Sequence, residues 1–168
     1  ASLENAAFEF QLDGWERKIL VITAEFAPSD GAVEWAKKLC LSDKYKDHYV
    51  IYLTHSYMKC HKCGNTVTPT EKYPLTQRPG NNSGVQLWEK LFSQVPNVRL
   101  VLCGHHGHSQ EKTPEGKRDR YDWSVGWRVD RNVAGKNVYQ MMFNVQTLGG
   151  GYEGNGGDGW LRILEFMP

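Results

Sequence analysis

The sequence lacks an excess of either charge, a long apolar run and a dense set of cysteines, and each absence excludes a class of protein. The 20 Lys and Arg residues are nearly balanced by 19 Asp and Glu residues, so no bulk positive charge is present to bind nucleic acid. No apolar stretch approaches the ~20 residues that cross a bilayer. Four cysteines are too few for a small scaffold stapled by disulfides. We therefore expect neither a nucleic-acid partner nor a membrane partner.

The chain does contain enough apolar material for one globular core. Its 168 residues are 40% hydrophobic and 12% aromatic, values typical of folded proteins. A chain of this length usually forms one domain, and we expect a single domain over residues 1–168. Two long polar stretches, residues 58–82 and 109–136, interrupt the apolar pattern and are predicted to be loops.

Apolar runs and helical patterns alternate along the chain, which predicts an α/β fold. One helix is expected after Pro28-Ser29-Asp30 and another after Asn82-Ser83, because both stretches are typical helix starts. Strands are expected at residues 8–12, 18–24, 49–54, 98–103, 137–145 and 160–166. The predicted fold is a mixed sheet of about five to six strands with two main helices.

Three of the six histidines fall within four positions, in the stretch VLCGHHGH. The apolar run before them predicts a buried strand, so His105, His106 and His108 follow its carboxyl end. His55 follows another predicted strand in the same way. Ligands of α/β sheets bind at the carboxyl ends of strands, and imidazole nitrogens bind Zn, Fe or Mn. The sequence therefore predicts a metal site at this rim, although His55 alone is equally consistent with a hydrogen-bonded structural histidine.

Three stretches leave more than one interpretation open. The CHKC stretch at residues 60–63 is consistent with a loop-closing disulfide, with half of a zinc site, or with incidental cysteines. The glycine-rich residues 148–159 lack the Lys-Ser/Thr pair of a phosphate-binding loop and are predicted to be a tight strand connection. Tyr121, Trp123 and Trp127 either line a cleft near the histidines or cover the sheet.

Four motifs, taken in order, are similar to those of a known superfamily of hydrolases. THSYM, GNNSGVQLWEKL, VLCGHHGH and NGGDGWLRILEF resemble segments of the calcineurin-like metallophosphoesterases, in particular the bacterial secreted or periplasmic phosphodiesterase-like branch. The resemblance extends over nearly the whole chain from about Phe8, but it covers only the second half of that fold. It implies part of a β-sandwich flanked by helices, and it favours a periplasmic or extracellular location.

The resemblance implies hydrolysis of a phosphomonoester or phosphodiester by a hydroxide that two divalent ions activate, with Mn, Fe or Zn as the expected metals. His55 and His105 match ligands of the second ion. The next motif position holds Gly107 where the superfamily has a histidine. Either His108 or His106 replaces that ligand, or the ligand is missing. His106 or His108 is also expected to protonate the leaving oxygen.

The superfamily motifs that supply the other ligands have no counterpart in residues 1–54. These motifs are an Asp and a His, a bridging Asp and an Asn-His pair. We therefore expect this chain to be the C-terminal portion of a phosphoesterase, to need an N-terminal half of the same protein as its partner, and to be inactive alone. One alternative is a truncated or degenerate domain that binds a ligand or a protein without turnover. Another is a small metal-binding module built on Cys60, Cys63 and the histidines.

Overall fold

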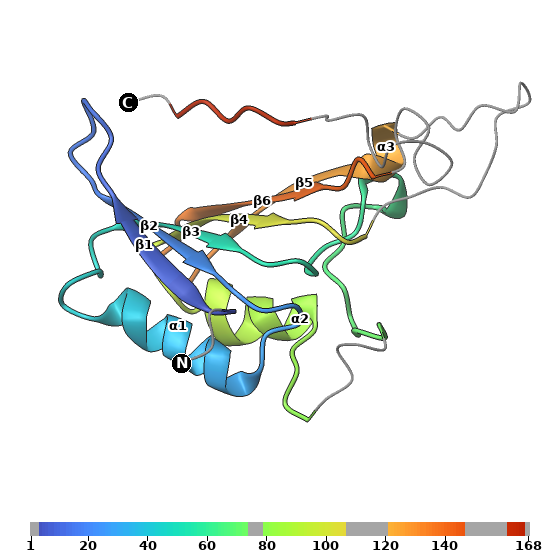
Figure 1. Ribbon diagram of the computed structural model, residues 1–168, viewed down its shortest axis with the longest axis horizontal. Coiled ribbons are helices and arrows are strands. Elements are labelled where there is room, and N and C mark those ends of the chain that lie inside the picture. The colour runs from blue at the N-terminus through green and yellow to red at the C-terminus, as the bar shows by residue number, and fades with distance from the viewer. Residues whose placement is uncertain (1–3, 74–78, 107–120, 147–160, 167–168) are drawn as a thin grey trace, which may run out of the picture.

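The computed structural model describes residues 4–73, 79–106, 121–146 and 161–166, and these build one six-stranded mixed sheet with helices on one face (Figure 1). The strands lie in the order β1-β2-β3-β4-β6-β5. Their bounds are Ala6–Phe10 for β1, Ile19–Thr23 for β2, Tyr49–Leu53 for β3, Val98–Cys103 for β4, Val125–Arg131 for β5 and Asn137–Phe143 for β6. The predicted α/β class, with a mixed sheet of five to six strands, is confirmed.

The four central strands are parallel, so their carboxyl ends meet at one edge of the sheet. β2 pairs with β3, β3 with β4, and β4 with β6 in parallel, whereas β1 and β5 flank them in antiparallel orientation. The central strands are short and mostly apolar, as expected for strands that pack on both faces. Their shared carboxyl edge is the position at which open α/β sheets bind ligands.

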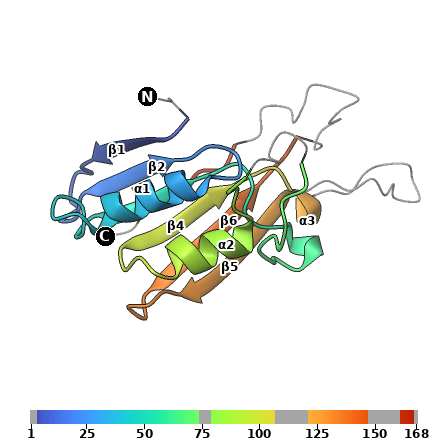
Figure 2. The same ribbon diagram turned by 90° about the horizontal axis from the view of Figure 1, so that it is seen from below.

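The two main helices cover the same face of the sheet, as Figure 2 shows from the helix side. α1 spans Asp30–Leu41, and α2 spans Gly84–Leu87 and continues as a π-helical turn, Trp88–Phe92. A single 3-10 turn, η1, spans His61–Cys63, and the short helix α3 spans Tyr121–Ser124. None of the described helices is long and apolar enough to span a membrane.

Both main helices begin where the sequence predicts, because a serine caps each of them. Ser29 accepts a hydrogen bond from the Ala32 N–H at the start of α1. Ser83 caps α2 in a reciprocal arrangement with Gln86, whose side chain accepts from the Ser83 N–H while the serine hydroxyl accepts from the Gln86 N–H. These caps satisfy backbone donors that would otherwise have no partner in the first turn.

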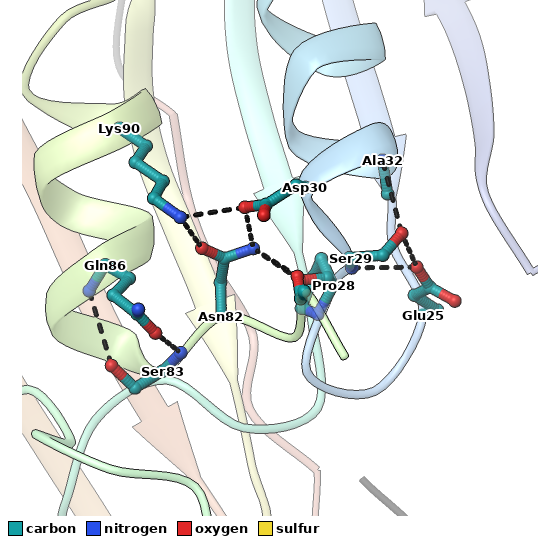
Figure 3. A network of polar contacts seen from close by, with 10 residues as sticks. Glu25, Pro28, Ser29, Asp30, Ala32, Asn82, Ser83, Gln86 and Lys90 are labelled. Carbon is teal, nitrogen blue, oxygen red and sulfur yellow. Dashed lines mark hydrogen bonds and ion pairs between the residues drawn. The ribbon is translucent and has the colours of Figure 1, made fainter. Parts of the chain in front are cut away.

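A buried asparagine ties the two helix starts together (Figure 3). Asn82 is 1% exposed, and its side-chain amide donates to the Pro28 carbonyl at 2.9 Å and to Asp30 Oδ1 at 3.1 Å. Its Oδ1 accepts from Lys90 Nζ at 2.7 Å. Lys90 also donates to Asp30 at 2.8 Å. The network fixes α1 against α2 and so fixes the layer that covers one face of the sheet.

The main core lies between the sheet and these two helices. Its largest fully buried side chains are Leu20, Ile22, Tyr52, Tyr57, Met58, Leu87, Leu91, Phe92 and Met142. Burial of one large apolar side chain stabilises a fold by about 1.5–3 kcal/mol. Several of these residues lie in β2, β3 and β6 or shortly after β3. Their packing holds the carboxyl ends of these strands in place.

The opposite face of the sheet is also apolar, but none of the described helices covers it. We call it the open face; its residues are Phe8, Phe10, Ile19, Val21, Tyr49, Ile51, Leu100, Leu102, Tyr139, Met141, Trp127 and Val129. Residues 161–166 lie across it, and Leu164 and Phe166 pack on its centre (Figure 1). Near the two edges of the sheet, Phe10 and Trp127 remain 50% and 45% exposed.

Two of the predictions along the chain are wrong. Residues 125–131 were expected within an irregular segment, but they form β5, which pairs with β6 along its whole length. Residues 161–166 were expected in a strand, but no strand is assigned there in the part of the chain that the structure describes. Residues 107–120 and 147–160, which contain His108 and the glycine-rich stretch, lie outside the described residues.

Two tryptophans that were candidates for a cleft cover the sheet instead. Trp123 packs against the main core. Trp127 lies on the open face against Tyr139, with ring centroids 5.8 Å apart. These two tryptophans are therefore not the aromatic residues that pack against the histidines.

Candidate metal centre

Two strand ends bring His55 and His105 together. His55 follows β3, His105 follows β4 after Gly104, and the two ring centroids lie 5.1 Å apart. The Gly104 N–H donates to the His55 carbonyl at 3.0 Å, which continues the pairing of the two strands past their ends. The meeting of these histidines at one rim follows from the parallel register of β3 and β4.

A left-handed turn at His105 places the next histidine beside it. His105 has a φ of 58°, a conformation that costs a non-glycine residue about 1–3 kcal/mol and that is concentrated at functional sites. Asn144 holds the turn by donating from Nδ2 to the His105 carbonyl at 2.9 Å. The His106 N–H donates to the Gly104 carbonyl at 2.7 Å. The rings of His105 and His106 then lie with centroids 4.7 Å apart.

A glutamate that sequence reasoning missed completes the cluster. The carboxylate of Glu71 and one ring nitrogen each of His105 and His106 all lie within 4.8 Å of one another. His106 Nε2 is 3.8 Å from Glu71 Oε2. One carboxylate and two imidazoles suit Zn²⁺, Mn²⁺ or Fe²⁺. The described residues therefore contain a donor set that fits one divalent ion.

The histidines predicted as metal ligands occupy different places relative to this cluster. His105 belongs to it. His55 is exposed and contacts the His105 ring, so it lies at the edge of the cluster and is not one of the three close donors. His106, expected either as a replacement ligand or as a proton donor, is a member. His108 lies outside the described residues.

The chain folds back on itself directly after β3, and this brings a carboxylate from the following loop to the histidines. Residues 58–67 form a tight clip, in which the Lys59 N–H donates to the Thr66 carbonyl at 2.8 Å. Cys60 and Cys63 form a disulfide in the clip, which selects one of the three interpretations that the sequence left open. Since the clip returns the chain to the end of β3, the residues after it stay close to the strand-end histidines.

Burial and hydrogen bonding hold the three groups in protonation states that bind a metal. Burial, and then the neighbouring His105, lower the pKa of His106 to about 4. The pKa of His105 is lowered as well, chiefly by burial. Burial raises the pKa of Glu71, but hydrogen bonds from Ser56 and from the Tyr73 N–H outweigh it and leave that pKa below its usual value. Neutral imidazoles beside an ionised carboxylate are the forms that ligate a cation.

Aromatic rings pack against the histidines. Phe26 contacts both His55 and His105, with ring centroids 4.7 Å apart in each pair. Tyr73 lies edge-on to His105 at 5.1 Å between centroids. These contacts limit the rotation of the imidazoles. They also keep water away from one side of the cluster, which strengthens electrostatic interactions there.

A cavity of about 470 Å³ opens beside His55 at the carboxyl ends of β2, β3, β4 and β6. Its walls are mostly apolar, with Leu53, Leu102 and Met141 among them, and Arg162 brings a positive charge. No Asp or Glu is among the described residues that line it. The described lining of this cavity therefore offers no carboxylate to a second metal ion.

Comparisons with known protein families, with curated proteins and with solved structures found no match to this chain. The chemistry of the site is therefore inferred from its donor set, its burial and the resemblance of its motifs.

Proposed function

We propose that this chain supplies histidine and glutamate ligands to a divalent-metal site that hydrolyses phosphoester bonds. The observation that carries the proposal is the cluster of Glu71, His105 and His106 at the carboxyl end of β4, with His55 at its edge. The strand-end histidines of THSYM and CGHH are also the positions at which the chain resembles the calcineurin-like metallophosphoesterases. The substrate is a phosphomonoester or a phosphodiester.

Each residue of the cluster has a role in this proposal. A divalent ion, Mn, Fe or Zn, supplies Lewis acidity toward a phosphoryl oxygen and lowers the pKa of a water molecule. His105, His106 and Glu71 hold the ion, and His55 extends the ligand set toward the cavity. Because the pKa of His106 is about 4, this residue suits metal binding better than proton donation at neutral pH. Protonation of the leaving oxygen is therefore assigned to His108.

The proposal extends to the architecture, in which the sheet is one layer of a β-sandwich and an N-terminal half of the same protein forms the other layer. Three observations support it. The open face is apolar and is only partly covered by residues that the structure describes, whereas mostly parallel sheets are covered on both faces. Exposed and half-buried side chains alternate over residues 161–166, as in a strand. The described residues that line the cavity beside His55 include no Asp or Glu, so the acidic ligands of a second ion would come from the N-terminal half.

A periplasmic or extracellular location belongs to the same proposal. The disulfide between Cys60 and Cys63 supports it, because such bonds persist in oxidising compartments. The same disulfide disfavours a zinc module built on the CHKC stretch, since cysteines bind zinc as thiolates and these two are bonded to each other.

A second candidate function is binding without turnover, in a truncated or degenerate domain of the same fold. It is favoured by the single carboxylate in the described cluster, which suits one metal ion and leaves a bridged pair incomplete. A domain of this kind would bind a phosphate-containing ligand or a protein through the metal and would not cleave it.

Metal analysis combined with a hydrolysis assay separates these functions. The chain alone should bind about one equivalent of Mn²⁺ or Zn²⁺ and should not hydrolyse an aryl phosphodiester. Joined to the N-terminal half, it should turn the ester over, and His55→Ala or His105→Ala should reduce the rate at least ~100-fold. His48→Ala is the matched control, because His48 precedes the amino end of β3 and bonds to Glu9 at 3.2 Å. Two bound metals without turnover of any phosphoester would sink the hydrolase proposal and favour binding.

A further inference from the structure

Ser56 is a buried serine whose hydroxyl lies between two members of the metal cluster. It follows His55 at the end of β3 and is 2% exposed. Its Oγ donates a hydrogen bond to Glu71 Oε2 and lies 2.9 Å from His106 Nε2. One hydroxyl group therefore connects the carboxylate ligand to one of the imidazole ligands.

The hydroxyl has one hydrogen for two neighbours, and this determines the tautomer of His106. An ionised carboxylate only accepts hydrogen bonds, so the hydrogen of Ser56 points to Glu71. The serine oxygen then accepts from His106, which requires a hydrogen on Nε2. An imidazole that ligates a metal is neutral and carries a single hydrogen. Nδ1 of His106 is therefore the nitrogen whose lone pair is left to bind an ion.

We propose that Ser56 is a positioning residue: its hydroxyl fixes Glu71 and His106 side by side and holds His106 in the Nε2–H tautomer, which leaves the lone pair on Nδ1 available to a divalent ion. This assignment rests on the proposed metal site and adds the residue that organises it. In metal sites a histidine ligand commonly has its second nitrogen fixed by a hydrogen bond. Here the partner is a hydroxyl that is itself fixed by a carboxylate.

The surroundings keep Ser56 from moving away from either neighbour. The next residue, Tyr57, is fully buried and donates from its hydroxyl to Gln140 Oε1 at 2.5 Å. The Glu71 side chain is 7% exposed, and its other oxygen accepts from the Tyr73 N–H at 2.9 Å. A hydroxyl buried to this degree does not reach a substrate. Ser56 therefore acts through its neighbours and not as a nucleophile.

The tautomer of His106 is measured directly by long-range ¹H–¹⁵N correlation spectra of the histidine side chains in metal-free protein. Wild-type protein should show a protonated Nε2 and a bare Nδ1 at His106. Ser56→Ala should remove this preference and give a mixture of tautomers or the Nδ1–H form. Ser56→Thr keeps a hydroxyl on Cβ and should restore the Nε2–H form.

The second measurement is the affinity for Zn²⁺ or Mn²⁺ by calorimetry. Loss of a group that orients a ligand typically weakens metal binding 10–100-fold, so Ser56→Ala should fall about that far below wild type, with Ser56→Thr close to wild type. Ser124→Ala is the matched control, because Ser124 is fully buried and its Oγ has no hydrogen-bond partner among the described residues. It should change neither the tautomer nor the affinity.

The outcomes separate this assignment from the proposed function. A wild-type His106 in the Nδ1–H form, or a Ser56→Ala variant with unchanged tautomer and affinity, overturns the role of Ser56. If the tautomer changes as expected but the wild-type protein binds no divalent ion, the role of Ser56 in orienting His106 is supported and the metal site is overturned. Thermal unfolding of each variant verifies that the compared proteins are folded.

Discussion

Gly84 lacks a side chain at a point where a helix packs directly on the backbone next to the candidate metal cluster. It is the first residue of α2, and a Cβ atom built there would lie 1.9 Å from the Tyr57 carbonyl oxygen and 2.8 Å from the Thr68 nitrogen. Its N–H also donates to Thr68 Oγ1 at 2.9 Å. The start of α2 is therefore packed directly against the backbone that follows Ser56, and any larger residue must displace that backbone.

Replacement of Gly84 by alanine should be strongly destabilising. The added methyl group overlaps a carbonyl that cannot move without breaking its pairing with Thr68, so we expect a loss of about 3 kcal/mol or more in the free energy of unfolding. Chemical denaturation measures this loss. Metal affinity should fall as well, because Ser56 and Glu71 shift with the displaced backbone.

Gly31→Ala in α1 is the matched control for this substitution. A Cβ atom at Gly31 meets only Ser29 Oγ, at 4.0 Å, and the residue is exposed. Because alanine loses less backbone entropy on folding, Gly31→Ala should stabilise the fold by about 0.5 kcal/mol. Equal effects of the two substitutions would contradict the close approach at Gly84.

Residue by residue, the sequence predicts the histidines of the site but not the groups that organise them. His55 and His105 were found because each follows an apolar strand and parallel strands end at one edge. Glu71 carries no such signal: it lies in a polar stretch and reaches the cluster only because the clip of residues 58–67 folds back. Ser56 was missed for another reason. Its role depends on how its single hydroxyl hydrogen is shared between Glu71 and His106, and only the folded chain brings these two residues together.

Among the elements, the strands of the parallel centre were predictable and the edges were not. β2 and β3 are nearly continuous apolar runs, and β4 and β6 are mostly apolar with a few polar interruptions such as Arg99 and Gln140; this is close to the pattern of a strand buried on both faces. β5 was missed because charged residues interrupt it and its alternating residues, among them Trp127 and Val129, face an open surface. Residues 161–166 show the alternation of a strand, but pairing is a long-range property that alternation alone does not guarantee.

The contact between the two helix starts depends on Asn82, and its replacement by alanine should show this. The substitution removes the side-chain bonds of Asn82 to the Pro28 carbonyl, to Asp30 and to Lys90, and each lost bond costs about 1 kcal/mol, because the Pro28 carbonyl keeps the Asn82 N–H and Lys90 keeps Asp30. We expect a total loss of about 2–4 kcal/mol by chemical denaturation. Ser83→Ala, which removes only the adjacent helix cap, should cost about 1 kcal/mol. A loss from Asn82→Ala no greater than this would contradict the network in Figure 3.

Asp130 links β5 to β6, and it should make stability depend on pH. A hydrogen bond from Arg128 is the main cause that lowers the pKa of Asp130; burial opposes it, and a hydrogen bond from Gln140 adds to it. A carboxylate with a lowered pKa in the folded state stabilises the fold fully above its unfolded pKa of about 3.9. That contribution is lost as the pH falls through the lower, folded value.

Unfolding at several pH values tests this linkage. Asp130→Asn should be less stable than wild type at pH 7, and the difference should shrink as the pH is lowered from about 5 to about 2. Asp43→Asn is the control, because the Asp43 side chain is fully exposed and its ion pair with Lys46 contributes little. A constant difference between Asp130→Asn and wild type across this range would show that Asp130 keeps an ordinary pKa.

At the scale of the whole molecule, the described residues cover one face of the sheet with helices and the other face only in part. The helix side has a closed core, whereas the open face has its own small cluster around Ile19, Ile51 and Leu100 that residues 161–166 only partly cover. The mixed sheet was predictable from the order of apolar runs. The open face was not, because coverage of a sheet depends on segments that a local pattern does not contain.

The open face should make this chain self-associate and bind an apolar dye when it is studied alone. Ile163, on the outer side of residues 161–166, is 84% exposed, and Trp127 is 45% exposed near the other edge of the sheet. Ile163→Lys combined with Trp127→Lys should reduce dye fluorescence and the oligomeric fraction in sedimentation, at a cost of about 1 kcal/mol in stability because Trp127 packs on Tyr139. Val133→Lys is the control: Val133 is 66% exposed but lies in the turn between β5 and β6, away from this face.

The same double variant distinguishes a bare surface from half of an interior. If an N-terminal half covers the open face, the two lysines enter a buried layer, and the joined protein should lose stability by several kcal/mol although the chain alone gains solubility. If nothing covers this face in the native protein, both forms should tolerate the lysines equally. A gain in solubility for the chain alone, together with a loss of stability for the joined protein, would therefore indicate that this sheet is one layer of a sandwich.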